Sequence, residues 1–176
     1  MKPQNSKFTS INKCLPALYK KLDSLYLCGQ LATEDIDAII DYGCGRYPEY
    51  VKQWRADRNK VLYQYDPYWE IDRMFNPERK QPKTFMLCLS NVLNVCVDWK
   101  KTLRSAINYW RAPNEGPHLI VIKVYEGDKT GIGRWNSKGY QQNLTLNAYW
   151  TQCSMHFGGD YWWFTRNGLL IGERLK

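Results

Sequence analysis

One stretch of the sequence, Ala38-Ile-Ile-Asp-Tyr-Gly-Cys-Gly-Arg46, decides the fold that we predict. It begins as a short apolar run typical of a buried strand, passes through an acid, and ends in two glycines that flank one residue. Glycine has no Cβ and accepts positive φ, so we expect Gly43 and Gly45 to take this conformation and let main-chain N–H groups reach a ligand where the next helix begins. A strand-turn-helix that binds nothing is the alternative, because a lone Gly-x-Gly pair is a weak motif.

A second apolar run, residues 61–66, ends in Asp66 roughly 20 positions after the glycines. A carboxylate at the end of that strand can accept hydrogen bonds from both hydroxyls of a ribose, so the pair of features predicts a nucleotide-type cofactor site. Pro48 stands where a G-x-G-x-x-G fingerprint needs its third glycine. A nicotinamide or flavin dinucleotide is therefore disfavoured.

The rest of the chain alternates helical and strand patterns, which favours an α/β fold with a mostly parallel sheet and helices on both faces. Helices are predicted over 11–27, where Pro16 opens or kinks the helix, after Pro48, over 99–111 behind an Asp98 cap, and over about 143–153. Strands are predicted over 37–42, 61–66, 84–89 and 118–125, with a degenerate strand or short helix near 71–75 and a glycine-rich loop over 127–139. Asn167-Gly168 between two apolar runs predicts a C-terminal antiparallel hairpin. We divide the chain into an N-terminal helical segment, 1–34, packed on a domain that spans 35–176.

Length and composition limit the class of protein. A chain of 176 residues suits one catalytic-sized domain without a separate recognition domain. It has no apolar run near 18 residues, and its N-terminus lacks the apolar core of a signal peptide, so we expect a cytoplasmic protein that does not enter a membrane. The six cysteines form no C-x-x-C pair, which indicates reduced thiols and predicts neither disulfides nor a metal site.

The formal charge of +8 and the 15% of aromatic residues suggest a polyanionic partner such as a nucleic acid. Lys and Arg recur over 46–60 and again over 79–104, in regions that should flank strand ends. Solvated helix faces on an ordinary basic protein would give the same pattern, so both interpretations stay open.

Three segments together resemble one group of known proteins. They are Asp41-Tyr-Gly-Cys-Gly-Arg46, Tyr65-Asp66-Pro67 and Leu89-Ser-Asn-Val-Leu-Asn-Val95. The first looks like motif I of class I S-adenosylmethionine-dependent methyltransferases. The combination resembles the small methyltransferase family associated with DNA phosphorothioation, which also occurs in phage genomes. The segment 137–142 and the aromatic last hairpin fit the same family, and the resemblance covers about residues 35–172.

The resemblance implies a Rossmann-like domain that binds S-adenosylmethionine in a crevice at the carboxyl ends of its strands. It implies that the motif I loop lines the methionine side and that Asp66 binds the ribose. It also implies that the pocket closes beneath the sulfonium at the end of the strand 84–89. The cofactor-binding residues so predicted are Asp41, Tyr42, Gly43, Gly45, Asp66, Pro67, Ser90 and Asn91. In proteins of this type the third strand usually supplies an acid that binds the adenine. Because the segment near 71–75 is degenerate here, the resemblance leaves adenine binding to Pro67, Tyr68 or main-chain groups.

Candidates for the acceptor side follow the strand 84–89. The side-chain amides of Asn91 and Asn94 could accept a hydrogen bond from a substrate N–H or O–H, which makes them the catalytic candidates, although either could simply cap a loop. Tyr140 and Gln141 could reach the same site from the opposite rim, or they begin a helix. Tyr68 is the third substrate-side candidate, because Asp66-Pro-Tyr-Trp69 superficially resembles the acceptor loop of amino-methyltransferases.

Three functions are consistent with the sequence. The first is methyl transfer from S-adenosylmethionine to a nucleic acid or a nucleic-acid-associated molecule. The second is a catalytically silent module that binds the cofactor or a nucleic acid, and the third is cleavage of the cofactor itself. The small size of the domain makes a protein partner or a homodimer an additional expectation.

Overall fold

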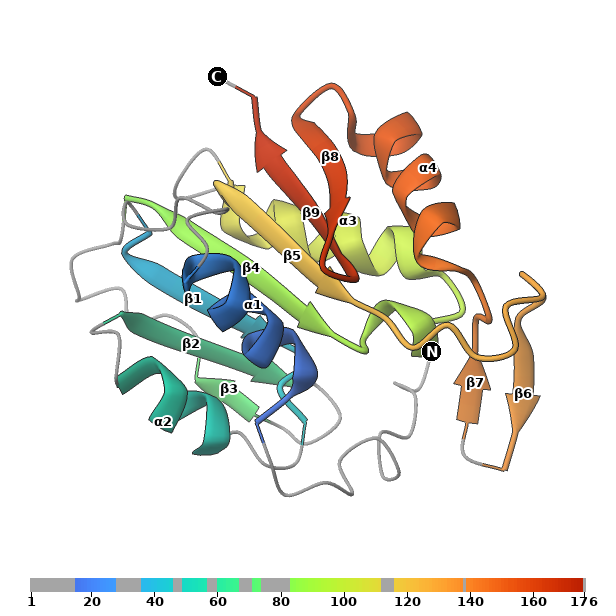
Figure 1. Ribbon diagram of the computed structural model, residues 1–176, viewed down its shortest axis with the longest axis horizontal. Coiled ribbons are helices and arrows are strands. Elements are labelled where there is room, and N and C mark those ends of the chain that lie inside the picture. The colour runs from blue at the N-terminus through green and yellow to red at the C-terminus, as the bar shows by residue number, and fades with distance from the viewer. Residues whose placement is uncertain are drawn as a thin grey trace.

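The computed structural model describes residues 15–27, 36–45, 49–56, 60–66, 71–73, 83–111, 116–137 and 139–175. Seven strands form one sheet in the order β3-β2-β1-β4-β5-β9-β8 (Figure 1). Their bounds are β1 (Ala38–Tyr42), β2 (Val61–Asp66), β3 (Ile71–Arg73), β4 (Phe85–Ser90), β5 (Leu119–Lys123), β8 (Tyr161–Arg166) and β9 (Leu169–Arg174).

The centre of the sheet is parallel and its margins are antiparallel. β2, β1, β4 and β5 pair in parallel, whereas β3, β9 and β8 each pair antiparallel with a neighbour. The predicted α/β class and the predicted C-terminal hairpin are confirmed. The degenerate segment near 71–75 contributes only the short marginal strand β3.

Helices cover both faces of the sheet, as the sequence predicts. α1 (Ala17–Leu27) and α2 (Glu49–Ala56) pack on one face, and α3 (Trp99–Arg111) and α4 (Leu146–Phe157) pack on the other. In Figure 1 α1 lies in front of the sheet and α3 lies behind it. β4 is buried on both sides, because Phe85, Leu87 and Leu89 face the layer of α3 and α4 while Met86 and Cys88 face the layer of α1 and α2. This is why its sequence reads as an almost unbroken apolar run.

Local signals set the ends of several elements. α1 begins directly after Pro16, whose carbonyl accepts the Tyr19 N–H at 3.0 Å. Asp98 caps α3 as predicted, since its Oδ1 accepts the Lys101 N–H at 3.1 Å. β8 and β9 are joined by Asn167 and Gly168 at φ of +50° and +66°, the positive values that a two-residue hairpin turn requires.

The segment predicted as a glycine-rich loop contains a second small sheet. β6 (Arg134–Asn136) and β7 (Gly139–Gln141) form an antiparallel hairpin, and the ring of Trp135 lies 5.4 Å from the ring of Tyr140 across it. The prediction that Tyr140 and Gln141 begin a helix is wrong. α4 begins only at Leu146, because the Thr145 side chain accepts the Ala148 N–H at 3.1 Å and so sets the N-terminus of the helix.

Two expectations from composition can be compared with the described residues. Within them, no helix combines the length and the apolar character needed to cross a membrane. The cysteines in the described ranges are Cys44, Cys88, Cys96 and Cys153, and all four are free thiols. Cys88 is completely buried in the core.

Candidate functional site

The candidate site lies at the carboxyl ends of β1, β2 and β4. From β1 the chain passes to β2 on one side, and from β4 it passes to β5 on the other side, so the connections diverge between β1 and β4. In open α/β sheets, ligands bind in the crevice at such a switch point. The residues that follow these strands are the Gly43–Gly45 loop after β1 and Asn91 after β4, while Asp66 closes β2.

Gly43 must be a glycine for two separate reasons. Its φ is +75°, and a Cβ placed on it would lie 2.4 Å from Cγ2 of Val92. Val92 belongs to the segment after β4, so the loop after β1 and the segment after β4 approach each other closely at this point. Gly45 also has positive φ, at +72°. The glycine pattern seen in the sequence is thus a requirement of this turn.

The main-chain N–H groups of the glycine loop bond within the protein. The Gly43 and Cys44 N–H groups donate to the Tyr65 carbonyl at 2.7 and 3.1 Å, and the Gly45 N–H donates to Asp66 Oδ2 at 2.8 Å. In this structure the N–H groups of both glycines thus have acceptors at the end of β2. Because β2 lies directly beside β1, its end takes up these donors and holds the loop against it.

Asp66 joins the loop to the end of β2. Its side chain is buried, with 5% of its surface exposed, and one oxygen accepts the Gly45 N–H. A carboxylate offers about four lone-pair sites, so it can accept several donors at once. The structure thus brings the predicted ribose-binding acid and the predicted glycine loop into direct contact.

Asp41 is buried beneath the loop. Its side chain is 2% exposed, accepts the Tyr19 hydroxyl at 2.6 Å and accepts Gln64 Nε2 at 3.5 Å. Burial, with a smaller contribution from nearby Asp66, raises the pKa of this carboxyl to about 6, although the two hydrogen bonds oppose the rise. Neither Tyr19 nor Gln64 was among the site residues predicted from the sequence. The only local signal was Gln64 itself, a polar residue inside the otherwise apolar and aromatic run of β2.

The next residue, Tyr42, lies at the rim of the same edge. Its ring centroid is 5.1 Å from that of Tyr65 at the end of β2, and burial raises the pKa of its hydroxyl to about 12. Tyr42 therefore stays neutral at physiological pH and can act there only as a hydrogen-bonding or packing group.

The end of β4 turns sharply after Ser90. Asn91 has φ of +57°, a value that asparagine tolerates better than most residues, and its N–H donates to the Lys123 carbonyl of β5 at 2.7 Å. Ser90 and Asn91 are both half-buried. Both lie at the switch point between β1 and β4.

Asn94 and Gln141 are brought together from opposite sides, as the sequence analysis expected. Asn94 lies in the short 3-10 helix η2 (Leu93–Val95), is 3% exposed, and its Nδ2 donates to Gln141 Oε1 at 3.4 Å. Tyr140, the next residue on β7, packs against Trp135. Pro67 and Tyr68 lie outside the described residues.

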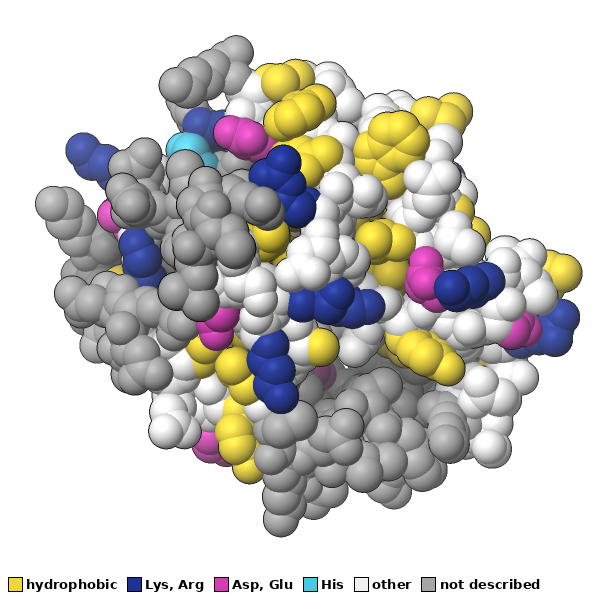
Figure 2. Space-filling view, in the orientation of Figure 1, with side chains coloured by type: hydrophobic (Ala, Val, Ile, Leu, Met, Phe, Trp, Pro, Cys, Tyr) yellow, Lys and Arg dark blue, Asp and Glu magenta, His cyan; other side chains and the backbone are white. Residues whose placement is uncertain are grey.

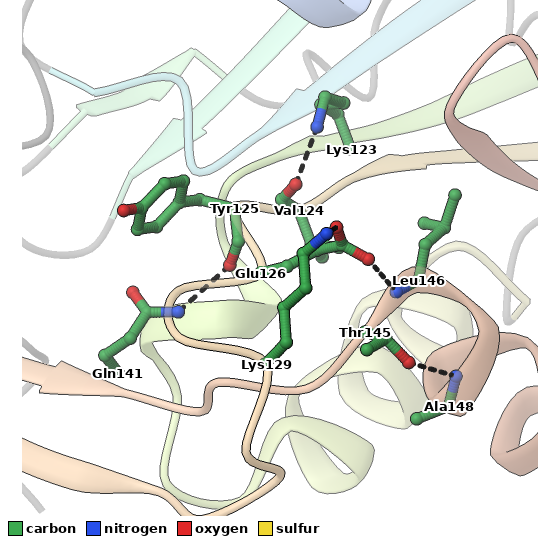
Figure 3. Close-up of polar contacts among 9 residues, drawn as sticks. All are labelled: Lys123, Val124, Tyr125, Glu126, Lys129, Gln141, Thr145, Leu146 and Ala148. Atoms are coloured by element: carbon green, nitrogen blue, oxygen red, sulfur yellow. Dashed lines mark hydrogen bonds and ion pairs between the residues drawn. The ribbon is translucent and has the colours of Figure 1, made fainter.

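The hairpin β6–β7 is attached to the rim by amide groups. The Gln142 N–H donates to the Asn94 carbonyl at 2.8 Å, and its Nε2 donates to the carbonyls of Cys96 and Val97, each at 3.1 Å. Figure 3 shows the other end of the attachment, where Gln141 Nε2 donates to the Tyr125 carbonyl at 3.0 Å. Glu126 accepts the Leu146 N–H at the start of α4, and this bond is the main reason that the pKa of Glu126 is lowered.

We expect Gln142→Ala to detach the hairpin without unfolding the domain. The change removes two side-chain bonds to main-chain carbonyls, each worth about 0.5–1.5 kcal/mol, so stability should fall by about 1–3 kcal/mol. Hydrogen exchange should accelerate most over 134–143. Gln53→Ala, on the exposed face of α2, is the matched control and should change neither quantity. Uniform acceleration across the sheet would contradict a local attachment.

The surface around this hairpin mixes apolar and charged groups, as the right side of Figure 2 shows. Tyr125, Ile132 and Trp135 are 63%, 58% and 70% exposed. Two cations there are paired, Lys129 with Glu126 at 3.3 Å and Arg134 with Asp128 at 3.6 Å. The hairpin therefore adds little net charge at the rim.

The chain matches no protein-family model, and no curated protein is significantly similar to it in sequence. Functional inference consequently depends on the geometry of the site and on the motifs themselves.

Proposed function

We propose that this protein is a Rossmann-like, S-adenosylmethionine-dependent methyltransferase whose acceptor is a nucleic acid or a molecule associated with one. The observation that carries the proposal is the contact between the Gly45 N–H and the Asp66 carboxylate beside the switch point of the sheet. A glycine turn and a strand-ending acid at adjacent strand ends are the two elements that a nucleoside site of this type uses.

The residues present fit such a cofactor. Asp66 would accept the ribose hydroxyls, and Ser90 and Asn91 would close the pocket beneath the sulfonium. Asp41 would support the loop from below, since its carboxylate already binds Tyr19 and Gln64. When bound, the cofactor supplies an electrophilic methyl group that an in-line displacement can transfer, so catalysis needs positioning more than a charged catalytic group.

The acceptor would enter over the rim formed by η2 and β7. There the amides of Asn94 and Gln141 meet, and the positions of Asn91 and Tyr140 flank them in the chain. An amide can orient a substrate amine or hydroxyl by hydrogen bonding without a change of charge. The assignment of Asn91 and Asn94 to this role is part of the proposal.

Asp66→Ala should weaken cofactor binding. Two hydrogen bonds to a carboxylate contribute about 1.5–3 kcal/mol each, so we expect the Kd for S-adenosylmethionine and for S-adenosylhomocysteine to rise by at least about 100-fold. Isothermal titration calorimetry measures both.

Asp37→Ala is the matched control for that experiment. Asp37 precedes β1 at the opposite edge of the sheet, where its carboxylate accepts the main-chain N–H groups of Lys83 and Thr84, each at 3.2 Å. Its loss should lower stability and leave the Kd unchanged. The proposal would be refuted if the unaltered protein gave no heat with either ligand.

A catalytically silent binding module is the second candidate, and one observation favours it. The loop N–H groups at positions 43, 44 and 45 all have acceptors within the protein, so they are not poised for a ligand. Incubation with methyl-labelled cofactor and separate DNA, RNA and protein fractions distinguishes the candidates. Label in one fraction supports the transferase, whereas binding without transfer supports the silent module and release of thioadenosine indicates cofactor cleavage.

A further inference from the structure

The outer surface formed by α3 and α4 carries basic residues without acidic ones. Neither helix contains an Asp or a Glu, although the whole chain contains 17 such residues. Their described cationic and imidazole side chains are Lys100, Lys101, Arg104 and His156. α1 and α2, on the other face of the sheet, each include an acid, Asp23 and Glu49.

The two helices bring these groups to one place. Lys100 Nζ lies 2.9 Å from His156 Nε2, and the Arg104 guanidinium lies 5.7 Å from the centre of the Phe157 ring. One turn of α3 is thus held against the C-terminal end of α4. We call Lys100, Lys101, Arg104 and His156 the α3–α4 basic patch.

The cations of this patch are not neutralised. In the described part of the chain, the side chains of Lys100, Lys101 and Arg104 form no ion pair. The neighbouring acid Asp98 uses one carboxylate oxygen as the cap of α3, where it accepts the Lys101 N–H. Lys129 and Arg134, in contrast, are both paired with acids.

From this arrangement we propose that the α3–α4 basic patch binds the phosphodiester backbone of a nucleic acid. Unpaired Lys and Arg on a helical surface are the groups that neutralise backbone phosphates. A lipid surface fits less well, because both helices bury an apolar side in the core: Leu103 and Ile107 from α3, and Tyr149 and Cys153 from α4. Trp150 and Met155 are the large apolar side chains that the described part of the two helices leaves exposed. An interfacial helix needs a free apolar side to insert into lipid.

The patch also lies where a bound strand would pass the candidate site. α3 follows η2 after a short turn, so its first turn begins at the carboxyl edge of the sheet, next to Asn94. Lys100 belongs to that first turn. Binding at the patch would therefore present part of the strand to the rim on which the proposed methyl transfer takes place, although the binding itself needs no cofactor.

The test compares two double variants that remove equal charge. One is Lys100→Gln with Arg104→Gln, from the patch, and the other is Lys129→Gln with Arg134→Gln, from the ion pairs. Binding of short fluorescent DNA and RNA is followed by anisotropy, without cofactor, as salt rises from about 50 to about 200 mM. Losing two phosphate contacts should reduce the slope of log affinity against log salt by about 1.8 on duplex DNA and by about 1.4 on a single strand. The control pair should retain most of its slope.

A third variant separates charge from packing. Arg104→Lys keeps the positive charge and loses the guanidinium beside Phe157, so it should retain the slope if the patch contacts phosphate. The proposal is overturned if both double variants reduce the salt slope equally or if the unaltered protein binds no nucleic acid. It is overturned as well if Arg104→Lys reduces the slope as much as a single Arg104→Gln change does. It is also overturned if polyglutamate or anionic vesicles compete as well as DNA and RNA through the same residues, since the surface would then belong to an acidic protein or a lipid. Calorimetry with S-adenosylmethionine on the same variants reports on the proposed function independently.

Discussion

Gly43→Ala should destabilise the domain and its candidate site together. The new methyl group would take the place of a hydrogen at φ of +75° and lie 2.4 Å from Cγ2 of Val92. The left-handed backbone costs about 1–2 kcal/mol for a residue with a side chain, and overpacking costs about 1–3 kcal/mol. We therefore expect the free energy of unfolding to fall by about 2–5 kcal/mol, measured by urea titration.

The steric part of this effect can be separated from the backbone part. Val92→Ala removes the methyl group that the new Cβ would meet, so it should be less harmful in the Gly43→Ala background than in the unaltered protein. The expected coupling between the two positions is about 0.5–3 kcal/mol. Gly159→Ala is the control, because a Cβ there meets no atom within 4 Å. Equal effects of the two glycine changes would show that the turn after β1 does not need a glycine at position 43.

The second large effect concerns the pH dependence of stability. Burial raises the pKa of Asp41 to about 6, from an ordinary value of 3.8. The folded protein thus holds this proton more tightly than the unfolded chain does. The contribution of Asp41 to stability is complete below a pH of about 4 and is lost as the pH rises through about 6. A shift of this size corresponds to about 3 kcal/mol.

Asp41→Asn should abolish that pH dependence. Other acids act in the opposite direction, since the pKa values of Asp37 and Glu126 are lowered by hydrogen bonds from main-chain or side-chain groups. The difference between the unfolding curves of the unaltered protein and Asp41→Asn, measured from about pH 4 to about pH 7, isolates the term due to Asp41.

Tyr19→Phe provides a complementary change at the same acid. The Tyr19 hydroxyl donates to Asp41 Oδ1 and opposes the rise in pKa, so its removal should move the titration of Asp41 to higher pH. Carboxyl-selective carbon NMR follows this titration directly. An Asp41 resonance that titrates near pH 4 in the unaltered protein would contradict the buried arrangement.

The sequence predicted the elements of this fold well where the information is local. The apolar run of β4, the Asp98 cap and the Asn167-Gly168 turn are each read from neighbouring residues, and the structure has all three. The hairpin β6–β7 was missed, because its two strands have three residues each and carry no apolar alternation. Its attachment is not local either, because the Gln142 side chain bonds to the carbonyls of Cys96 and Val97, more than 40 positions earlier in the chain.

For the candidate site, the sequence by itself determined the residue types: two glycines after one strand, an acid at the end of the next, and amides after a third. Only the tertiary structure decided what those groups bind. It assigns the N–H groups of Gly43 and Gly45 to the end of β2, and the carboxylate of Asp41 to Tyr19 on α1. The physical reason is that backbone conformation and hydrophobic periodicity depend on near neighbours in the chain, whereas hydrogen-bond partners depend on which strands and helices become adjacent when the core is packed.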